Sequence, residues 1–273
     1  MNVTFTVLLP VHRPPDLLPY AIESVLAQSR QDFELIVICD GAPQATVDCA
    51  RAAAARDTRI QVHAHPKGER IGEAYRHQAL AAARGSLVCQ LADDDLWFPN
   101  HLHEMAQLLR DFEFGNVMEL HVQTTGEVTG VIGDLGAARV RHAMMTGRYN
   151  FFGPSAAGYR LSTYRRMPEG WAPAPPDIWS DLHMWRKFLR LPGIVCGTRV
   201  AFTGVHFPTS HRRDWPLERR AAETRAWVER GRDPVLRDRI GQQILRRLMA
   251  ARLAQGAKPA AAPAAPAPTG NAR

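Results

Sequence analysis

Apolar residues in the first hundred positions fall into short continuous runs, separated by segments with helical character. Continuous apolar runs bounded by turn residues predict buried strands. These runs cover Val3–Val11, Phe33–Cys39, Ile60–Ala64 and Ser86–Ala92. The segments between them predict helices at Asp16–Ser29, Ala45–Arg56 and Gly72–Arg84. This β-α-β-α-β-α-β order is typical of an α/β fold with a doubly wound, mostly parallel sheet.

The pattern becomes less regular after residue 100. The elements predicted there are a helix over His101–Arg110, a hairpin from Val117–Gln123 and Glu127–Ile132, and a helix over Asp181–Leu191. Residues 133–180 are rich in Gly, Pro and aromatic residues, so we expect loops that line a site there. Residues 216–253 predict two basic helices, with a break near Gly231–Pro234.

Charge divides the chain of 273 residues into a neutral part and a basic part. The net charge is +7, yet residues 1–210 carry 20 Lys and Arg against 21 Asp and Glu, and residues 211–273 carry 14 against 6. We therefore predict a main domain over 1–210, a basic helical extension over 211–255 and an Ala/Pro-rich tail over 256–273. The tail cannot bury a core and is expected to be disordered. A basic extension fits a membrane surface or another anionic partner; no nucleic-acid partner is expected, because no such motif accompanies it.

Compartment signals point to the cytoplasm. No stretch reaches the roughly 18 apolar residues that a membrane-spanning helix needs. The N-terminal segment lacks a basic start and is expected to be a first strand rather than a signal peptide. The four cysteines form no CxxC pair, so reduced, mostly buried thiols are expected instead of a zinc site or a redox dithiol.

Polar residues that could carry chemistry follow the predicted strands at their carboxyl ends. His12 and Asp40 each follow an apolar strand, and Asp93-Asp94-Asp95 follows the strand at Ser86–Ala92. In doubly wound sheets, ligands bind beyond these strand ends. Three adjacent carboxylates repel one another and need a cation, for which Mg²⁺ or Mn²⁺ is suited. The alternative interpretation of the triplet is a solvated acidic turn that caps the following helix.

Four segments in this order resemble glycosyltransferase family 2: Thr6–Arg13, Ala21–Gln28, Asp32–Gly41 and Leu91–Leu102. The last of them is similar to the DxD-type motif of that family and the helix after it. The resemblance implies a glycosyltransferase A fold, a nucleotide-sugar donor, a divalent metal and transfer with inversion at the anomeric carbon. It covers residues 1–110, the donor half, and is weaker over the acceptor half, residues 111–210.

The resemblance also assigns donor contacts. Pro10, His12 and Arg13 would border the base and ribose of the nucleotide. Asp40 would hydrogen-bond the base, normally uracil, which makes UDP the expected nucleotide. The alternative for Asp40 is a turn former before Gly41.

Within the triplet, Asp94 falls on the metal-binding position of the family, and Ala92 stands where an acid usually precedes it. Asp93 would take that place after a one-residue shift and contact ribose or metal. Asp95 is the metal ligand if the motif is Asp93-x-Asp95. All three remain candidates at this point.

Two further groups of candidates surround this motif. Arg70 or Arg76 could meet the diphosphate, although each could equally be a charge on a helix surface. A late histidine often completes the metal site in the family, which makes His206 the candidate. His211, beside two arginines, is the alternative, and its cationic surroundings suit a diphosphate better than a metal.

The catalytic base is expected in an acidic motif before a helix, and Trp179–Arg186 is similar to it. Asp181 is therefore the candidate base, with Asp177 in reserve. Ser180 stands where the family more often has Glu. The alternative for Asp181 is an ordinary acidic residue at a helix N-terminus.

Together these inferences predict an inverting, metal-dependent glycosyltransferase that uses Mn²⁺ or Mg²⁺. It would move a sugar from a UDP donor to a glycan or lipid-linked acceptor, and contact the inner face of the membrane through its basic helices. A non-catalytic nucleotide-sugar-binding protein is the alternative. A nucleotidyltransferase is a weaker one, because no Gly-rich loop follows the first strand.

Overall fold

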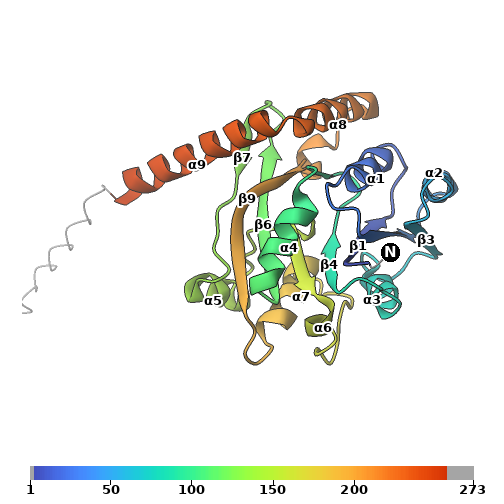
Figure 1. The fold of residues 1–273 in the computed structure, drawn as a ribbon, viewed down its shortest axis with the longest axis horizontal. Helices are drawn as coiled ribbons and strands as arrows, with labels where there is room; N and C mark the ends of the chain where they lie inside the picture. Colours follow the sequence, from blue (N-terminus) through green and yellow to red (C-terminus); the bar gives the residue numbers. More distant parts are fainter. Residues whose placement is uncertain (1–2, 257–273) are drawn as a thin grey trace, which may run out of the picture.

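A nine-stranded sheet forms the centre of the protein in the computed structural model, which describes residues 3–256 (Figure 1). The strand order is β3-β2-β1-β4-β8-β6-β9-β5, and β7 pairs with β6. The strands are β1 (Phe5–Val11), β2 (Phe33–Asp40), β3 (Ile60–His65), β4 (Leu87–Gln90), β5 (Leu96–Trp97), β6 (Phe114–Val122), β7 (Val128–Gly130), β8 (Ala157–Arg160) and β9 (Cys196–His206).

Nine α-helices and two short 3₁₀ helices accompany the strands within the described residues, and the last three of these helices follow the final strand. The α-helices are α1 (Leu18–Leu26), α2 (Gln44–Ala54), α3 (Glu73–Ala81), α4 (His101–Asp111), α5 (Ala138–Thr146), α6 (Leu161–Tyr164), α7 (Ser180–Leu189), α8 (Leu217–Arg232) and α9 (Pro234–Gly256). The 3₁₀ helices are η1 (Pro154–Ala156) and η2 (Thr209–Arg212). Helices α1 and α2 lie on one side of the β1–β3 strands and α3 lies on the other (Figure 1).

The sheet is parallel in its first half and mixed in its second half. Strands β1 to β4 pair in parallel, as the doubly wound pattern predicts. Strand β8 then pairs antiparallel with both β4 and β6, and β9 is parallel to β6 but antiparallel to β5. The mixed α/β class predicted from the sequence is thus confirmed, with an antiparallel insertion in the second half of the sheet. Sequence periodicity could not show the antiparallel insertion, because pairing depends on neighbours far away in the chain.

Residues 133–180 contain more regular structure than the loops predicted from their composition. Helix α5, strand β8 and the short helix α6 all lie in this range. Strand β8 has only four residues and is buried between two other strands, so its sequence shows neither a long apolar run nor alternation. Gly and Pro in this segment correctly indicate the turns, but the sheet around β8 supplies the hydrogen bonds that make it a strand.

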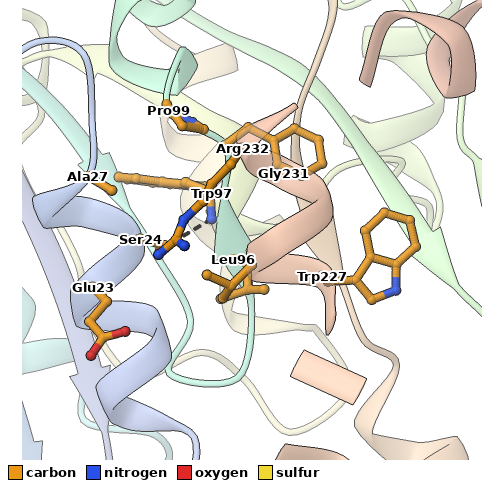
Figure 2. Close-up of a pocket in the computed structure, with 11 residues that line it drawn as sticks. Glu23, Ser24, Ala27, Leu96, Trp97, Pro99, Trp227, Gly231 and Arg232 are labelled. Atoms are coloured by element: carbon orange, nitrogen blue, oxygen red, sulfur yellow. Dashed lines mark hydrogen bonds between the residues drawn. The ribbon is translucent and has the colours of Figure 1, made fainter. Parts of the chain in front are cut away.

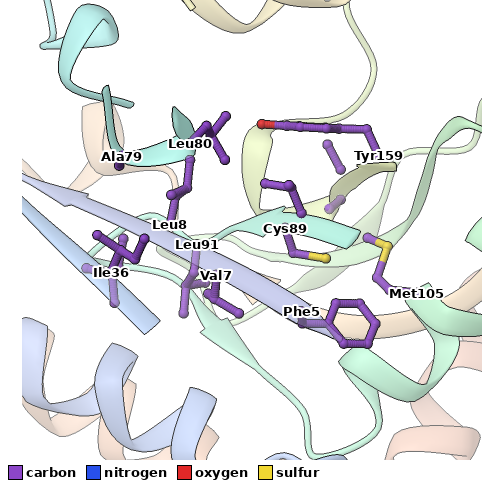
Figure 3. Packing of buried hydrophobic residues seen from close by; sticks show 14 of the residues in the cluster. Phe5, Val7, Leu8, Ile36, Ala79, Leu80, Cys89, Leu91, Met105 and Tyr159 are labelled. Atoms are coloured by element: carbon purple, nitrogen blue, oxygen red, sulfur yellow. The ribbon is translucent and has the colours of Figure 1, made fainter. Parts of the chain in front are cut away.

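The main core lies on both faces of the β1–β4 strands. All eight residues of β2 are buried, as expected for a central strand with both faces covered. The one charged residue inside it, Glu34, accepts hydrogen bonds from Thr6 and Arg84. Leu8 and Ile36 are paired in register on neighbouring strands and lie beneath Leu80 of α3 (Figure 3). Because side chains alternate along a strand, Phe5 and Val7 face the opposite layer. This packing fixes the strand ends at which the polar residues lie.

The helices α8 and α9 pack on the other end of the sheet through a second, smaller core. Trp227 of α8 and Ile244 of α9 are buried there with Val122 and Val205 from two strands. Figure 2 shows a small apolar pocket of about 50 Å³ where α8 meets α1 and β5, lined by Trp97 and Trp227 among others. Helix α9 then continues beyond the sheet (Figure 1). The predicted tail lies outside the described residues, except for residue 256. No helix within residues 3–256 is long and apolar enough to span a membrane.

Candidate functional site

Three adjoining hollows follow the carboxyl ends of β1, β2 and β4. The β1–β2 hollow, of about 170 Å³, is lined by Pro10, Val11, His12, Arg13, Asp40, Ile71, Arg76, Gln90, Ala92, Asp93 and Pro154. The aspartate hollow, of about 330 Å³, is lined by Ala92, Asp94, Asp95, Glu119, His121, Val131, Asn150, Phe151, Phe152, Gly153, Pro154, Trp179, Asp181 and His206. The arginine hollow, of about 470 Å³, is lined by Arg70, Ile71, Arg76, Gln90, Arg148, Pro154, Trp171, Pro176, Ile178, Trp179, Ser180 and Asp181. Pro154 borders all three, so they form one cleft.

The cleft brings together most residues that the sequence singles out. Five of the predicted donor-binding residues line the β1–β2 hollow: Pro10, His12, Arg13, Asp40 and Asp93. The predicted metal ligands and the predicted base line the aspartate hollow: Asp94, Asp95, His206 and Asp181. Arg70 is separate from the other donor-binding candidates and lines the arginine hollow. The reserve candidates Asp177 and His211 are exposed and line none of the three.

Asp40 ends β2 as a buried carboxylate whose two oxygens are both engaged. Its Oδ2 lies 2.5 Å from Nζ of Lys67, and its Oδ1 accepts a hydrogen bond of 2.6 Å from the Gly68 amide. Gly41 and Gly72 have positive φ, and a Cβ on Gly72 would lie 2.6 Å from Cγ of Asp40. The two glycines therefore let the 67–72 segment close over this carboxylate. The turn at Gly41 and the contacts of Asp40 with Lys67 and Gly68 are both present, and the contact of Asp40 with a nucleotide base stays a prediction.

Arg13 supplies a cation for two of the three adjacent aspartates. Its Nε lies 3.0 Å from Asp93 Oδ2, and its Nη1 donates a hydrogen bond of 2.8 Å to Asp94 Oδ2. Burial raises the pKa of Asp93 to about 7, an effect that Arg13 opposes and the Asp94 charge reinforces. All three aspartates are buried. The predicted need for a compensating cation is thus met in part by the chain itself.

Asp94 receives two more donors from the C-terminal part of the chain. The hydroxyl of Thr209 in η2 donates a hydrogen bond to its Oδ2, and Nη2 of Arg220 lies 3.5 Å from the same oxygen. Arg220 is 126 residues away in sequence and belongs to α8. No local pattern distinguishes Arg220 from the other arginines of this basic helix. Its place beside Asp94 is decided only by the packing of α8.

Asp95 is paired with the histidine predicted from the apolar run before it. His206, the last residue of β9, lies with Nδ1 2.9 Å from Asp95 Oδ1, and Ser155 donates a hydrogen bond of 2.6 Å to Asp95 Oδ2. Burial alone would lower the pKa of His206, but the carboxylates of Asp95 and Glu119 outweigh it and raise that pKa to about 10. Burial likewise opposes ionisation of Asp95, yet His206 holds the pKa of Asp95 below its usual range.

Glu119 and His121 of β6 complete the aspartate hollow and were not among the sequence candidates. Burial, with the nearby Asp95 charge, raises the pKa of Glu119 to about 8. Burial and the neighbouring His206 lower the pKa of His121 to about 4, and the two imidazole rings lie 5.0 Å apart. Two polar residues spaced by two in an apolar strand face the same side. That spacing was the signal that could have identified them.

Asp181 lies at the border between the aspartate hollow and the arginine hollow. It is the second residue of α7 and accepts hydrogen bonds of 2.8 Å from Asn150 Nδ2 and 2.7 Å from the Leu182 amide. Its side chain is half-buried, and burial raises its pKa above the usual range despite these hydrogen bonds. A carboxylate with a raised pKa next to a cavity is suited to accept a proton from a bound hydroxyl.

The carboxylates of Asp94 and Asp95 line the aspartate hollow, and they differ in how many of their oxygens already accept hydrogen bonds. Both oxygens of Asp95 accept hydrogen bonds, whereas Asp94 uses only Oδ2 among the described residues. No three His, Cys, Asp or Glu side chains within residues 3–256 are grouped so that they could hold a metal ion alone. Mg²⁺, however, commonly takes only one or two protein carboxylates together with substrate phosphates. Asp94 Oδ1 fits that requirement.

His206 has the hydrogen bond that metal-ligating histidines usually make. Such histidines donate one ring N–H to a carboxylate and bind the metal through the other nitrogen. Here Nδ1 is occupied by Asp95, and Nε2 takes part in no hydrogen bond among the described residues. The donor set of Asp94 and His206, with Asp95 orienting the imidazole, therefore fits a divalent cation that displaces the Nε2 proton of His206, which the neighbouring carboxylates otherwise retain.

Comparison with known proteins supports a family assignment for this chain. The succinoglycan biosynthesis protein ExoW of Rhizobium meliloti (strain 1021) is 33% identical over 110 residues, which cover 40% of this chain and 34% of that protein. The match thus spans about a third of the relative's length.

Two solved structures share the fold at low sequence identity. S. aureus TarS 1–349 in complex with UDP-GlcNAc is 14% identical, covers 91% of this chain and 73% of its own, and has a TM-score of 0.59. The mannosyltransferase PcManGT from Pyrobaculum calidifontis, in complex with GDP-Man and Mn²⁺, is 17% identical, covers 96% and 77%, and has a TM-score of 0.55. The model of the family described as glycosyl transferase family 2 matches residues 6–152, more than half of the sequence. The chain therefore belongs to glycosyl transferase family 2.

Proposed function

We propose that this protein transfers a sugar from a UDP-sugar to a hydroxyl group of a saccharide acceptor, with inversion at the anomeric carbon. The observation that carries the proposal is the position of Asp181. This half-buried carboxylate with a raised pKa lines the same hollow as Asp94 and Asp95. The β1–β2 hollow beside it contains Asp40 and Arg13, the residues that family resemblance assigns to the nucleotide. TarS binds UDP-GlcNAc and PcManGT binds GDP-Man, which supports a nucleotide-sugar as donor.

The chemistry follows from a base and a leaving group on opposite sides of one carbon. Asp181 takes the proton of the acceptor hydroxyl, and the oxygen forms a bond to the anomeric carbon of the donor sugar. The bond from that carbon to the diphosphate oxygen breaks, and the electron pair leaves with UDP. Attack from the face opposite the leaving group inverts the configuration. Asn150 orients the carboxylate through its hydrogen bond to Oδ2.

The negative charge that develops on the diphosphate needs fixed positive charge nearby. Arg13 and Arg220 are the guanidinium groups already placed at Asp94. A Mg²⁺ or Mn²⁺ ion held by Asp94 and His206 would add charge neutralisation there when bound. Asp93, whose burial raises its pKa, is proposed to contact the ribose or the phosphates from the β1–β2 hollow.

Calorimetric titration of the whole chain with UDP, with and without Mn²⁺, tests the donor assignment. We expect metal-dependent binding that is lost in Asp94→Ala and retained in Asp177→Ala, a matched substitution of an exposed aspartate outside the three hollows. Absence of UDP binding under both conditions would contradict the donor assignment. Equal binding by Asp94→Ala would remove the metal role of Asp94.

Turnover separates this enzyme from a protein that only binds nucleotide-sugars. Release of UDP from UDP-sugars, measured with a coupled assay, is expected for the wild type and should fall sharply in Asp181→Asn, while UDP binding is unchanged. A chain that binds UDP-sugars but releases no UDP with any acceptor would favour the non-catalytic alternative.

A further inference from the structure

The arginine hollow carries an excess of positive charge, and the proposed transfer reaction gives this charge no role. Three arginines line it, Arg70, Arg76 and Arg148, against one carboxylate, Asp181. None of the three adjacent aspartates lines this hollow; they lie along the neighbouring two. Its positive charge is therefore not compensated by the acidic motif.

Two buried side chains that line both the arginine hollow and the β1–β2 hollow each have one polar atom without a partner, although Arg76 Nη2 donates a hydrogen bond to the Ile71 carbonyl. Arg76 is 4% exposed and Gln90 is 5% exposed. The Arg76 Nε and the Gln90 Oε1 are both buried and make no hydrogen bond to the chain. Buried polar atoms without a partner are uncommon and call for an explanation, such as a ligand that is absent. Glu73 provides part of the countercharge for Arg76, but it does not line the hollow.

Two arginine–tryptophan contacts line the hollow, an exposed one between Arg148 and Trp179 and a buried one between Arg76 and Trp171. The Arg148 guanidinium lies 4.8 Å from the ring centre of Trp179, and Arg76 lies 4.9 Å from that of Trp171. Arg148 and Trp179 are exposed. Flat aromatic faces pack on the apolar face of a sugar ring, and arginine forks bind carboxylate or phosphate with two parallel hydrogen bonds. Asp181, the proposed base, is within the same hollow.

We propose that the arginine hollow binds an acidic saccharide, so that the acceptor carries a carboxylate or a phosphate next to the hydroxyl that Asp181 deprotonates. This inference rests on the proposed function, since it takes Asp181 as the base. The exposed Trp179 packs against the ring, and Arg148 and Arg70, both exposed, bind the anionic group. Arg76 and Gln90 offer their unpartnered atoms to the ring hydroxyls. Neutral saccharides would leave the three guanidiniums without an anion.

Ligand-observed NMR titration of the full chain, in the presence of UDP and Mg²⁺, tests the inference. The probes are methyl β-glucuronide for a carboxylate, glucose 6-phosphate for a phosphate and methyl β-glucoside as the neutral compound. At least one acidic probe is expected to bind about tenfold more tightly than the neutral one, and which of the two does so identifies the anion. In Arg148→Gln this preference is expected to disappear while the dissociation constant for UDP stays the same. Arg165→Gln, a matched change of an exposed arginine outside the hollows, should behave as the wild type.

Several outcomes overturn the inference. Equal affinity for neutral and acidic probes, no binding of any probe, or an unchanged preference in both Arg148→Gln and Arg70→Gln would each do so. Loss of UDP binding in Arg148→Gln would assign the hollow to the donor diphosphate instead. Failure of the proposed function is distinguishable: the wild type would then bind no UDP, or release none from UDP-sugars, whatever its preference among the saccharides.

Discussion

The buried ion pair between Arg212 and Glu223 stabilises the packing of α8 against the sheet. Arg212 in η2 is 1% exposed, and its Nε and Nη2 lie 2.7 Å from the two carboxylate oxygens of Glu223 on α8. The same Nη2 donates a hydrogen bond of 2.8 Å to the carbonyl of Val122, the last residue of β6. One guanidinium thus joins the sheet to the helix that places Arg220 beside Asp94. Arg212→Met should show how much this ion pair contributes to the free energy of unfolding.

The magnitude follows from what the substitution leaves behind. Methionine fills much of the volume but leaves the Glu223 carboxylate and the Val122 carbonyl without their donor. Breaking a buried pair by removing one partner costs about 3–5 kcal/mol. Because the Glu223 side chain keeps 16% exposure and some contact with water, we expect the lower end, about 3 kcal/mol. At about 2–4 °C per kcal/mol for a chain of this size, the melting temperature should fall by about 6–12 °C.

Urea unfolding followed by circular dichroism and tryptophan fluorescence provides the measurement. The control is Arg232→Met, which removes the pair with Glu229 at the end of α8, where both side chains are 64% exposed. That change should stay within about 0.5 kcal/mol of the wild type. The double variant Arg212→Met/Glu223→Met should be more stable than Arg212→Met alone, because no unpaired buried charge remains. An Arg212→Met protein as stable as the Arg232→Met control would refute the reasoning.

Three further predictions address catalysis, acid stability and membrane contact. Burial raises the pKa of Asp181, and a base must be deprotonated, so turnover should fall as the pH drops through this raised pKa. The turnover rate of Asp181→Asn should be about 10²–10⁴-fold lower than that of the wild type. If the variant keeps the same fall in turnover at low pH, another group causes that fall. Burial beside Trp97 lowers the pKa of His101 to about 3. Between about pH 6.5 and 3 the unfolded chain therefore binds a proton that the folded chain does not, and the free energy of unfolding decreases as the pH falls through this range. His101→Gln should weaken this loss in melting experiments, and an equal pH dependence would exclude His101 as its source. Arg246 and Arg247 are exposed on α9. Replacing both with Gln should weaken binding to anionic vesicles, measured by co-sedimentation, by about 30-fold, at about 1 kcal/mol per arginine. No binding by the wild type, or equal binding to neutral vesicles, would contradict the membrane contact.

The sequence by itself determined the first half of the fold and the position of the acidic motif. The helix and strand order up to residue 111 was predictable except for β5, because each of the other elements buries an apolar run or face that its own residues display. The two residues of β5 are too few to show a pattern, and they form a strand only because they pair with β9. Strands β1, β2 and β4 end where polar residues begin, so His12, Asp40 and Asp93 could be placed at one sheet edge. Asp181 became a candidate because Trp179–Arg186 is similar to a motif of the family; the structure places it in the aspartate hollow, and its role as base stays a prediction.

Only the tertiary structure decided which groups meet this edge from the rest of the chain. Ser155 bonds Asp95 from 60 residues away, and Arg220 reaches Asp94 from 126 residues away. The antiparallel insertion of β8 and the packing of α8 produce these contacts, and neither is encoded in local periodicity. Glu119 shows what each source provides. The sequence shows that it is a polar residue in an apolar strand, but only the folded structure shows the burial that raises its pKa. Charge compensation, burial and pKa depend on distances between residues that are remote in sequence, and these distances exist only once the chain has folded.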